Sequence, residues 1–400
     1  MTHSGGPPQR EGTVTVLHVI TGLNAGGAEL MLRRLVETHA GDSRYRHRVV
    51  SLREWGPVGD QLREAGVEVE ALGITGAASF ARGFLRLVGI VRRVRPDIVQ
   101  TWMYHADLVG GAAARLAGVR AVIWGVRVAD IFPAMGVSRS LLWGRRLSAR
   151  LSRLIPARIL YVAESARQVH ERLGYSADRS IVIQNGYRIP SDAEVAEARA
   201  RRRAELGIGA DVVLIGTAGR FSPQKGFDGF VKGAAALAAR HPDVRFVMLG
   251  REVDPGNPAI AGWIGASGHA DRFHALGETR VLHEWLSAMD VFGLYSLGEG
   301  FPNVVAEAMS VGTPCVVTDV GDAALLVDTT GHVVSSGDLD GFTAALEALV
   351  AAGPEGRRRL GAAARARVET HFSMAAIAKR YGDLYEELTS AGAPAGAGSE

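Results

Sequence analysis

The chain has 400 residues, more than a single hydrophobic core usually serves, so its length predicts two domains. Its composition is 47% hydrophobic and 22% charged with a net charge of only +3, which indicates a globular protein and gives no reason to expect nucleic acid as a partner. The single cysteine, Cys315, lies in an apolar run and is expected to be a buried strand thiol. Because no apolar stretch is long enough to span a bilayer and the N-terminus lacks the apolar core of a secretion signal, we expect a cytoplasmic protein.

Short apolar runs alternate with helical periodicity along the first half of the chain. The pattern predicts helices at residues 28–38, 58–65, 80–94, 106–117 and 138–154. Strands are expected at residues 14–20, 48–52, 67–72, 98–102, 121–126, 159–162 and 181–184. Strands that alternate with helices indicate βαβ units and a parallel sheet.

A turn signal at Asn185-Gly186, followed by Pro190, places a domain boundary near residues 186–192. After a polar helix at residues 193–206 the alternation resumes, with strands at 212–217, 245–249, 273–275, 291–295, 314–318 and 332–334. We therefore expect an α/β protein with two Rossmann-like domains whose strand ends face each other across a cleft. The expected ranges are a disordered N-terminus at 1–12, domains at 13–188 and 189–373, a helix at 374–389 that could pack on either half, and a disordered tail at 390–400.

One strand-to-helix junction carries two carboxylates eight residues apart, Glu299 and Glu307. Glu299 lies in the loop before the helix and Glu307 about one turn inside it. Pro302 suits the first position of this helix, which leaves the N–H groups of Asn303 and Val304 pointing out of its end. A helix N-terminus with free N–H groups favours an anion such as a phosphate. The arrangement predicts a diphosphate flanked by two hydroxyl-rich groups, as in a nucleotide sugar.

The first strand ends in a glycine-rich loop that contains Gly26 and Gly27. These glycines let the backbone approach a ligand closely, and the next helix N-terminus favours an anion. The spacing from Gly22 does not match the Gly-x-Gly-x-x-Gly fingerprint of dinucleotide-binding proteins, which disfavours a dehydrogenase. A tight strand-to-helix turn without a ligand is the alternative.

Arg220 and Lys225 lie in the loop after the first strand of the second half. A guanidinium fork and a mobile ammonium suit a pyrophosphate whose charge grows as it leaves. Two solvated surface charges are the alternative. The position after a strand, flanking glycines and the Glu299 loop in the same half favour the functional interpretation.

His105 follows a strand of the first half, with Asp107 two residues further on. At the expected cleft it would position or deprotonate an acceptor hydroxyl. A structural histidine is the alternative.

Four pieces of the chain together resemble the retaining nucleotide-sugar glycosyltransferases of the GT-B fold, in the family-four group. The resemblance runs from Val14 to about Thr389, and its pieces are Gly26-Gly-Ala-Glu29, Gly219-Arg220…Lys225-Gly226, Glu299-Gly-Phe-Pro-Asn-Val-Val-Ala-Glu307 and Thr318-Asp-Val-Gly321. It implies a metal-independent hexosyltransferase without a cofactor, in glycan or glycolipid assembly. The first domain would then hold a glycan or lipid-linked acceptor, and the second a nucleotide sugar, with UDP as the expected nucleotide.

The resemblance also implies roles for single residues. Arg220 and Lys225 should bind the distal phosphate of the donor, Glu299 the sugar hydroxyls and Glu307 the ribose hydroxyls. Main-chain groups of Phe301–Val304, which includes Pro302 and Asn303, should meet the diphosphate and the sugar.

On the other half, Gly26 and Gly27 should also approach the donor, and His105 falls where the family often has an active-site histidine. The nucleotide base should lie near Leu276–Val281. Two departures stand out: Arg188 replaces an acid that the family often has at the interdomain turn, and Trp102 ends a strand where many members have a further histidine.

Three rival functions share some of these features. A retaining glycosidase also uses two carboxylates, but it needs them about 5 Å apart across one bond, and it would hydrolyse glycosides that carry no nucleotide. A nucleotide-sugar epimerase of similar fold would convert its substrate without an acceptor. A non-catalytic nucleotide-sugar-binding protein would bind the nucleotide and release none.

Other polar residues are assigned structural roles. Asp338 and Asp340 look like a metal-binding pair, but an Asp before a helix is a favoured N-cap. His269, His274 and His283 lack paired ligand spacing, and His3, His18 and His39 are interpreted as ordinary, isolated residues.

The segment at residues 138–155 is basic and amphipathic. One interpretation is attachment to an anionic membrane surface on the inner face of the membrane, which would suit a lipid-linked acceptor. The other, slightly favoured, is an ordinary helix that packs its apolar face on its own sheet.

Overall fold

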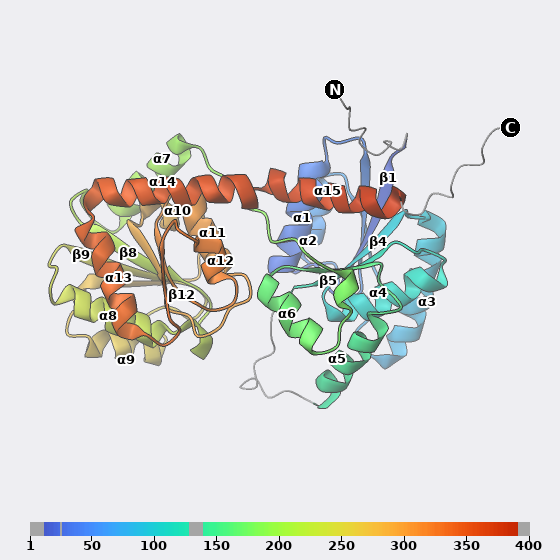
Figure 1. Ribbon diagram of the computed structural model, residues 1–400, viewed down its shortest axis with the longest axis horizontal. Helices are drawn as coiled ribbons and strands as arrows, with labels where there is room; N and C mark the ends of the chain where they lie inside the picture. The colour runs from blue at the N-terminus through green and yellow to red at the C-terminus, as the bar shows by residue number, and fades with distance from the viewer. Residues whose placement is uncertain (1–11, 25, 128–138, 391–400) are drawn as a thin grey trace, which may run out of the picture. The chain divides into compact units, whose positions relative to one another are not determined.

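The computed structural model describes residues 12–24, 26–127 and 139–390 (Figure 1). Nearly all of the two terminal segments that were expected to be disordered lies outside the described residues. The chain divides into two compact units, one formed by Met1–Gln184 with Ile377–Glu400 and the other by Asn185–Ala376. The division falls four residues before the predicted end of the first domain at residue 188.

The first unit contains a seven-stranded sheet in the order β3-β2-β1-β4-β5-β6-β7, and all neighbouring strands pair in parallel. Every residue of the central strands β4 and β5 is buried, as expected for a parallel sheet covered on both faces. The strands are β1 (Val14–Ile20), β2 (Tyr45–Ser51), β3 (Glu68–Ala71), β4 (Ile98–Trp102), β5 (Val122–Val126), β6 (Arg158–Tyr161) and β7 (Ser180–Val182). The helices are α1 (Gly27–His39), α2 (Pro57–Glu64), α3 (Ala77–Val94), α4 (Tyr104–Leu116), α5 (Arg139–Leu151) and α6 (Glu164–Arg172).

The last helix, α15 (Met374–Ser390), contributes its residues from Ile377 onward to the first unit. Two fully buried tyrosines on it reach the sheet: Tyr385 donates to Gln100 Oε1 at 2.5 Å, and the Tyr381 hydroxyl accepts from Arg127. In Figure 1 this helix lies along α1 and β1 at the red end of the colour scale. The sequence left open which half this helix would join.

The second unit contains a six-stranded parallel sheet in the order β10-β9-β8-β11-β12-β13. Its core is a cluster of buried aromatic and aliphatic side chains around Phe230, Phe246 and Phe342. The strands are β8 (Val213–Ala218), β9 (Val244–Leu249), β10 (Phe273–Gly277), β11 (Val291–Leu294), β12 (Cys315–Thr318) and β13 (His332–Val334). The helices are α7 (Asp192–Glu205), α8 (Phe227–Ala238), α9 (Pro258–Ala266), α10 (Leu282–Ala288), α11 (Asn303–Ser310), α12 (Ala323–Val327), α13 (Leu339–Ala351) and α14 (Gly353–Phe372).

The prediction of two Rossmann-like α/β domains is confirmed, because both sheets are parallel and both strand orders reverse direction beside the first strand of the unit. The reversal lies between β1 and β4 in one sheet and between β8 and β11 in the other. Ligand sites in such sheets form outside the carboxyl ends of the strands at this reversal. The facing of the two edges across a cleft stays a prediction.

Candidate functional site

In the second unit, the loops after β8 and β11 are joined by hydrogen bonds at the carboxyl edge of the sheet. The carbonyl oxygen of Gln224 accepts from Leu297 N at 2.7 Å and from Ser296 Oγ at 2.8 Å. Gly226 has φ +57°, and a Cβ there would lie 1.9 Å from the carbonyl oxygen of Tyr295. Only glycine permits this approach, so the sequence Lys225-Gly226 brings the two loops into contact.

The contact between the loops pairs two of the predicted site residues. Lys225 Nζ lies 2.6 Å from Glu299 Oε1, which also accepts from Ser296 Oγ at 2.7 Å. The Glu299 side chain is only 9% exposed and that of Lys225 23%, so the pair is partly desolvated and stronger than a surface ion pair. The sequence predicted that both residues serve one ligand, and the structure places them in direct contact.

Arg220 follows β8 directly and is exposed. Its loop is held by a second close approach, because a Cβ at Gly250 would lie 1.8 Å from the carbonyl oxygen of Gly219. Arg220 thus lies on a rigid backbone and presents its guanidinium to solvent at the same sheet edge as the Lys225–Glu299 pair.

Helix α11 begins at Asn303, so Pro302 is its N-cap residue and not its first helical residue as the sequence suggested. The cause is the carbonyl oxygen of Pro302, which already accepts the first helical hydrogen bond, from Val305 N at 3.0 Å. The expected consequence is unchanged, since the N–H groups of Asn303 and Val304 still have no carbonyl one turn back. Phe301, Pro302 and Val304 are buried around this helix end.

The Asn303 side chain is directed toward the start of the second unit. Its Oδ1 accepts from Asn185 Nδ2 at 2.8 Å and from the Tyr187 hydroxyl at 2.5 Å. With Oδ1 occupied, the main-chain N–H and the side-chain Nδ2 of Asn303 are the groups left to donate to a ligand. Glu307 lies one turn into α11 and is half-buried.

A third loop, after β12, supports the segment that carries Glu299. Gly321 has φ +59°, and a Cβ there would lie 2.4 Å from the carbonyl oxygen of Gly300. The same oxygen accepts from Asp322 N at 2.8 Å. Three loops from three neighbouring strands thus converge on Glu299, and β10 ends beside the predicted base-binding residues at Leu276.

In the first unit, His105 lies in the first turn of α4 and is exposed. It lines a cavity of about 280 Å³ at the carboxyl edge of the sheet. The polar walls come from Thr21, Arg53, Thr75 and His105, and the apolar walls include Leu52, Ile74, Phe80 and Val109. These residues follow β1, β2, β3 and β4 or belong to α3 and α4, so the cavity lies at the reversal point of this sheet.

Asp107 has a different role from the one that its closeness to His105 in sequence suggested. Its Oδ1 accepts from Thr101 Oγ1 at 2.5 Å and from Gly125 N at 3.0 Å. Burial raises the pKa of this carboxyl group to about 7. Asp107 therefore ties α4 to β4 and β5 beneath the cavity and does not orient the His105 ring.

The glycine loop after β1 ends at the start of α1, where Gly26 is the N-cap residue. A Cβ at Gly26 would lie 2.5 Å from Glu29 Oε2, so the Glu29 carboxylate folds back over this helix end. Burial raises the pKa of Glu29. The anion site predicted at Gly26 and Gly27 therefore lies next to the Glu29 carboxylate, which is itself negatively charged when ionised.

Three histidines that the sequence analysis treated as isolated or did not single out form one buried chain, which corrects that interpretation. His18 Nε2 lies 2.9 Å from His47 Nδ1, and His47 Nε2 lies 3.0 Å from His39 Nδ1. The chain is closed by Trp102 Nε1, which donates to His18 Nδ1 at 3.1 Å, and by the carbonyl oxygen of Ala378, 3.3 Å from His39 Nε2. Parallel pairing of β1 with β2 sets His47 opposite Val16, two residues before His18 on the same face of the sheet, which single-residue reasoning does not reveal.

The other candidates have structural explanations. Asp338 Oδ1 accepts from Gly341 N at 2.8 Å and caps α13, as predicted. Among the described residues no cluster of three or more His, Cys, Asp or Glu side chains is arranged to hold a metal ion. Cys315 is buried, and burial raises its thiol pKa, so it is a core residue.

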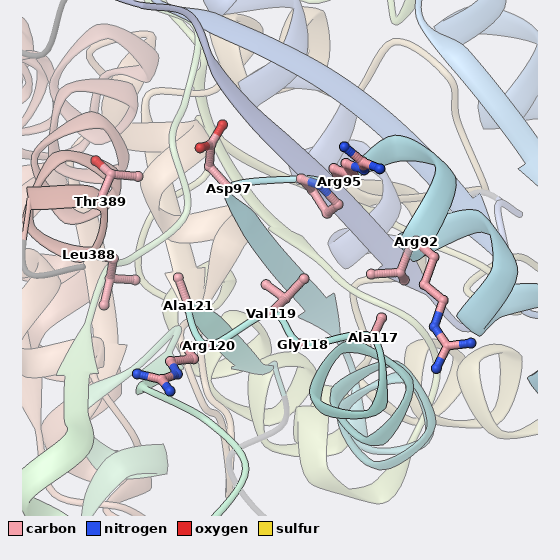
Figure 2. Close-up of a pocket in the computed structure, with 12 residues that line it drawn as sticks. Arg92, Arg95, Asp97, Ala117, Gly118, Val119, Arg120, Ala121, Leu388 and Thr389 are labelled. Atoms are coloured by element: carbon pink, nitrogen blue, oxygen red, sulfur yellow. The ribbon is translucent and has the colours of Figure 1, made fainter. Parts of the chain in front are cut away.

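A hollow of about 690 Å³ lies at the opposite, amino-terminal edge of the first sheet (Figure 2). Three arginines line it, but Figure 2 shows the guanidinium groups of Arg92 and Arg120 pointing apart. Asp97 on the same wall accepts from Thr15 N at 2.9 Å. Diverging cations do not make an anion site, so the hollow is not a candidate.

Comparison with known proteins identifies the class that this fold and site define. Residues 25–189 match the profile of the family described as Glycosyltransferase Family 4, and residues 212–352 match that of Glycosyl transferases group 1. The chain belongs to the family-four glycosyltransferases, which have the GT-B fold.

Among curated proteins, the chain is similar to the lipopolysaccharide core biosynthesis mannosyltransferase LpsB of Rhizobium meliloti, with 32% identity over 46% of this chain and 54% of that protein. It is also 28% identical to the putative glycosyltransferase EpsF of Bacillus subtilis over 76% of this chain and 79% of that one. The chain thus spans about half the length of the Rhizobium protein. The crystal structure of Anabaena HepE in complex with UDP has the same fold, with a TM-score of 0.79 and 20% identity over 94% of this chain and 100% of that one.

Proposed function

We propose that this protein is a retaining glycosyltransferase that moves a sugar from a nucleoside diphosphate, with UDP as the nucleotide, to a hydroxyl of a glycan or lipid-linked acceptor. The observation that carries the proposal is the Lys225–Glu299 pair, at 2.6 Å, beside the N-terminus of α11. A cation for a phosphate and a carboxylate for sugar hydroxyls then lie at one sheet edge. The UDP complex of the structurally similar Anabaena protein supports UDP as the nucleotide.

The reaction breaks the bond between the anomeric carbon and the diphosphate oxygen, which leaves negative charge on the diphosphate. Lys225, Arg220 and the free N–H groups of α11 would stabilise that charge as it develops, so the chain itself supplies the positive charge. Glu299 would hold the sugar hydroxyls and Glu307 the ribose hydroxyls. The acceptor oxygen forms the new bond on the same face, and its proton passes to the departing phosphate oxygen, which retains the configuration.

His105 would position the acceptor hydroxyl from the first unit. It is exposed in the wall of the 280 Å³ cavity, where an acceptor can reach it. Because Asp107 is bonded elsewhere, this role rests on the location of His105 and not on a carboxylate–histidine pair.

A thermal-shift screen with UDP, GDP and ADP tests the donor site, because a ligand at about one hundred times its Kd stabilises the folded state by about 2.7 kcal/mol. Lys225→Gln should weaken binding of the stabilising nucleotide about tenfold or more. The matched control is Lys232→Gln, which removes an exposed lysine of α8 that pairs with Asp228. A screen in which no nucleotide stabilises the protein, or equal losses in both variants, would refute the proposed donor site.

The rival functions predict different products. An epimerase would convert the nucleotide sugar without an acceptor, and a binding protein would release no nucleotide. We expect release of nucleoside diphosphate that depends on an added acceptor.

We also propose that the basic segment at residues 138–155, which contains α5, attaches the first unit to an anionic membrane surface. Leu147 and Leu154 are 52% and 70% exposed, and they lie among the exposed residues Arg146, Arg150 and Arg153. Exposed leucines favour this role over a helix that packs all its apolar residues on its own sheet. No helix in the described part of the chain is long and apolar enough to cross a membrane.

Flotation with vesicles tests this attachment. The protein should float with vesicles that contain anionic lipid at low salt and should be released by high salt. The double variant Leu147→Gln/Leu154→Gln should float less, whereas Leu85→Gln, which removes another exposed leucine at 70% exposure on α3, should not change flotation. Absence of flotation at low salt would end this proposal.

A further inference from the structure

The cavity beside His105 has an unusual set of polar groups for a site that would hold a sugar. None of the ten described residues that line it carries a carboxylate, and one of them is an arginine. We propose that the acceptor is anionic: the ring polyol that meets His105, whether alone or as the end unit of a glycan or lipid-linked acceptor, carries a phosphate or carboxylate group that Arg53 binds. This inference rests on the proposed function, because it names the class of substrate that meets His105.

Arg53 stands on a fixed backbone. Its N–H donates to the carbonyl oxygen of Thr21 at 3.1 Å, and its own carbonyl accepts from Gly73 N at 3.1 Å. These bonds continue the pairing of β2 with its two neighbours beyond the ends of the strands. The side chain therefore starts from a defined point on the cavity wall.

The Arg53 guanidinium is exposed, and it forms no hydrogen bond or ion pair with any residue in the described ranges. The adjacent carboxylate, Glu54, accepts a hydrogen bond from Asn24 instead, with Asn24 Nδ2 3.4 Å from Glu54 Oε1. Arginine presents a planar fork of N–H donors that matches a phosphate or a carboxylate. Arg53 has no carboxylate partner among the described residues, and the described lining of the cavity contains no carboxylate, so an anion in the ligand is favoured.

Two further features agree with an anionic polyol. Thr21 is one of the residues that line the cavity, and its Oγ1, shielded from solvent, has no hydrogen-bond partner in the part of the chain that the structure describes. The N-terminus of α3 also borders the cavity through Gly76 and Ala77, and its dipole adds to the positive potential.

An aromatic residue in the lining and the size of the cavity limit the ligand. Phe80 is 44% exposed and stacks on Phe84, so its ring offers a flat apolar surface to the carbon face of a ring. A volume of about 280 Å³ lies at the lower end for small-molecule sites, which suits one ring with one substituent.

The test is calorimetric titration of the full chain, with UDP present, against hexoses, the corresponding hexose 6-phosphates and 1-phosphates, and hexuronic acids. At least one charged probe should bind about ten to one hundred times more tightly than its neutral parent, as expected for a charge-assisted bidentate contact. Arg53→Gln should remove this preference and leave binding of the neutral hexose within about twofold. The phosphate and carboxylate arms identify which anion the site prefers.

The matched control is Arg46→Gln, since Arg46 is an exposed arginine near the other end of β2. It should keep the preference for the charged probe, and circular dichroism of both variants should match the wild type. Equal binding of charged and neutral probes, no binding of any charged probe, or a preference that survives in Arg53→Gln would overturn the inference. Titration with UDP alone measures the affinity of the donor site separately. Loss of UDP binding would count against the proposed donor site, whereas loss of the preference for charged probes would count against the role of Arg53.

Discussion

The buried chain of His18, His47 and His39 predicts a strong pH dependence of stability. An indole nitrogen only donates and a carbonyl oxygen only accepts, so the two ends of the chain fix the direction of every bond. Trp102 donates to His18 Nδ1, which places the His18 proton on Nε2, and each following ring repeats this arrangement up to the carbonyl oxygen of Ala378. All three rings are therefore neutral Nε2–H tautomers, and a proton on any acceptor nitrogen would break a bond.

Burial is the largest cause that lowers the pKa of each of the three histidines. The pKa of His18 lies well below its usual value of 6.5, that of His39 is lowered, and that of His47 is lowered to about 3. Neighbouring histidines lower it further for His18 and His47. For His39, the backbone bond to Ala378 and the Asp42 charge oppose burial without cancelling it.

The sign follows from proton linkage. Below about pH 6.5 these three histidines bind protons in the unfolded chain but stay neutral in the folded chain. Their contribution to the free energy of unfolding is therefore highest above that pH and falls as the solution becomes more acidic. With a pKa of 6.5 unfolded and about 3 folded, His47 alone accounts for a loss of about 1.9 kcal/mol between pH 7 and pH 5. This is a large part of the stability of a typical domain.

The perturbation is His47→Gln, which keeps a donor and an acceptor near the same positions but does not titrate. Urea unfolding at pH 7, 6 and 5, with hydrogen exchange of β1 peptides to follow the first unit, gives the free energy of unfolding of that unit. The wild type should lose about 1.9 kcal/mol more than the variant over this range. Comparing the two proteins cancels the contribution of other titrating groups, including Asp107.

His105→Gln, at an exposed histidine of the same unit, is the control for loss of one histidine. Nitrogen chemical shifts of the rings should independently show protons on Nε2 of all three residues at pH 7. Parallel pH curves for the wild type and His47→Gln, or a proton on Nδ1 of any of the three rings, would refute the reasoning.

The remaining predictions concern single contacts. Gly226→Ala should destabilise the second unit by about 1–3 kcal/mol and weaken UDP binding in calorimetric titration, because its Cβ would lie 1.9 Å from the carbonyl oxygen of Tyr295. The control is Gly207→Ala, at a similar positive φ but with no atom close to the added Cβ, which should leave UDP binding unchanged. Asp107→Asn should remove a contribution to the free energy of unfolding that falls by about 2 kcal/mol between pH 5 and pH 7 in the wild type, since a raised carboxyl pKa means that the unfolded chain releases its proton first. Urea curves in which the wild type and the variant change by equal amounts between the two pH values would contradict this. Glu299→Gln should abolish sugar transfer while the circular dichroism spectrum and UDP binding persist, and loss of UDP binding would indicate that Glu299 has a structural role instead.

The sequence predicted the fold well because the signals that define it are local. Most strands of the two sheets are short apolar runs, and β8 and β11, which precede the loops with Arg220, Lys225 and Glu299, are among them, so the pattern alone placed these residues at one sheet edge. What failed depends on pairing between distant segments. His18 meets His47 only through the register of β1 and β2, and Asp107 turns away from His105 because Thr101 and Gly125 lie beneath it.

The same distinction applies to Arg53, which no motif marked. Its significance comes from a cavity whose walls follow four different strands, and from the lack of a carboxylate among those walls. A sequence pattern reports which residues lie near one another along the chain. The composition of a cavity is a property of the tertiary structure, so a specificity residue on a loop without a motif becomes visible only in the fold.

The Lys225–Glu299 pair explains how a site for a charged donor can exist without destabilising the protein that carries it. A half-buried ammonium without a partner would incur a desolvation cost, and so would the nearly buried Glu299 carboxylate. Each neutralises the other, and Ser296 adds a hydrogen bond to the carboxylate. In the proposed donor site, the diphosphate of a nucleotide sugar would pair with the lysine and its sugar hydroxyls with the glutamate, so binding would exchange one internal pair for two external ones. Only a ligand with both groups completes that exchange, and this favours the intact donor over either of its parts.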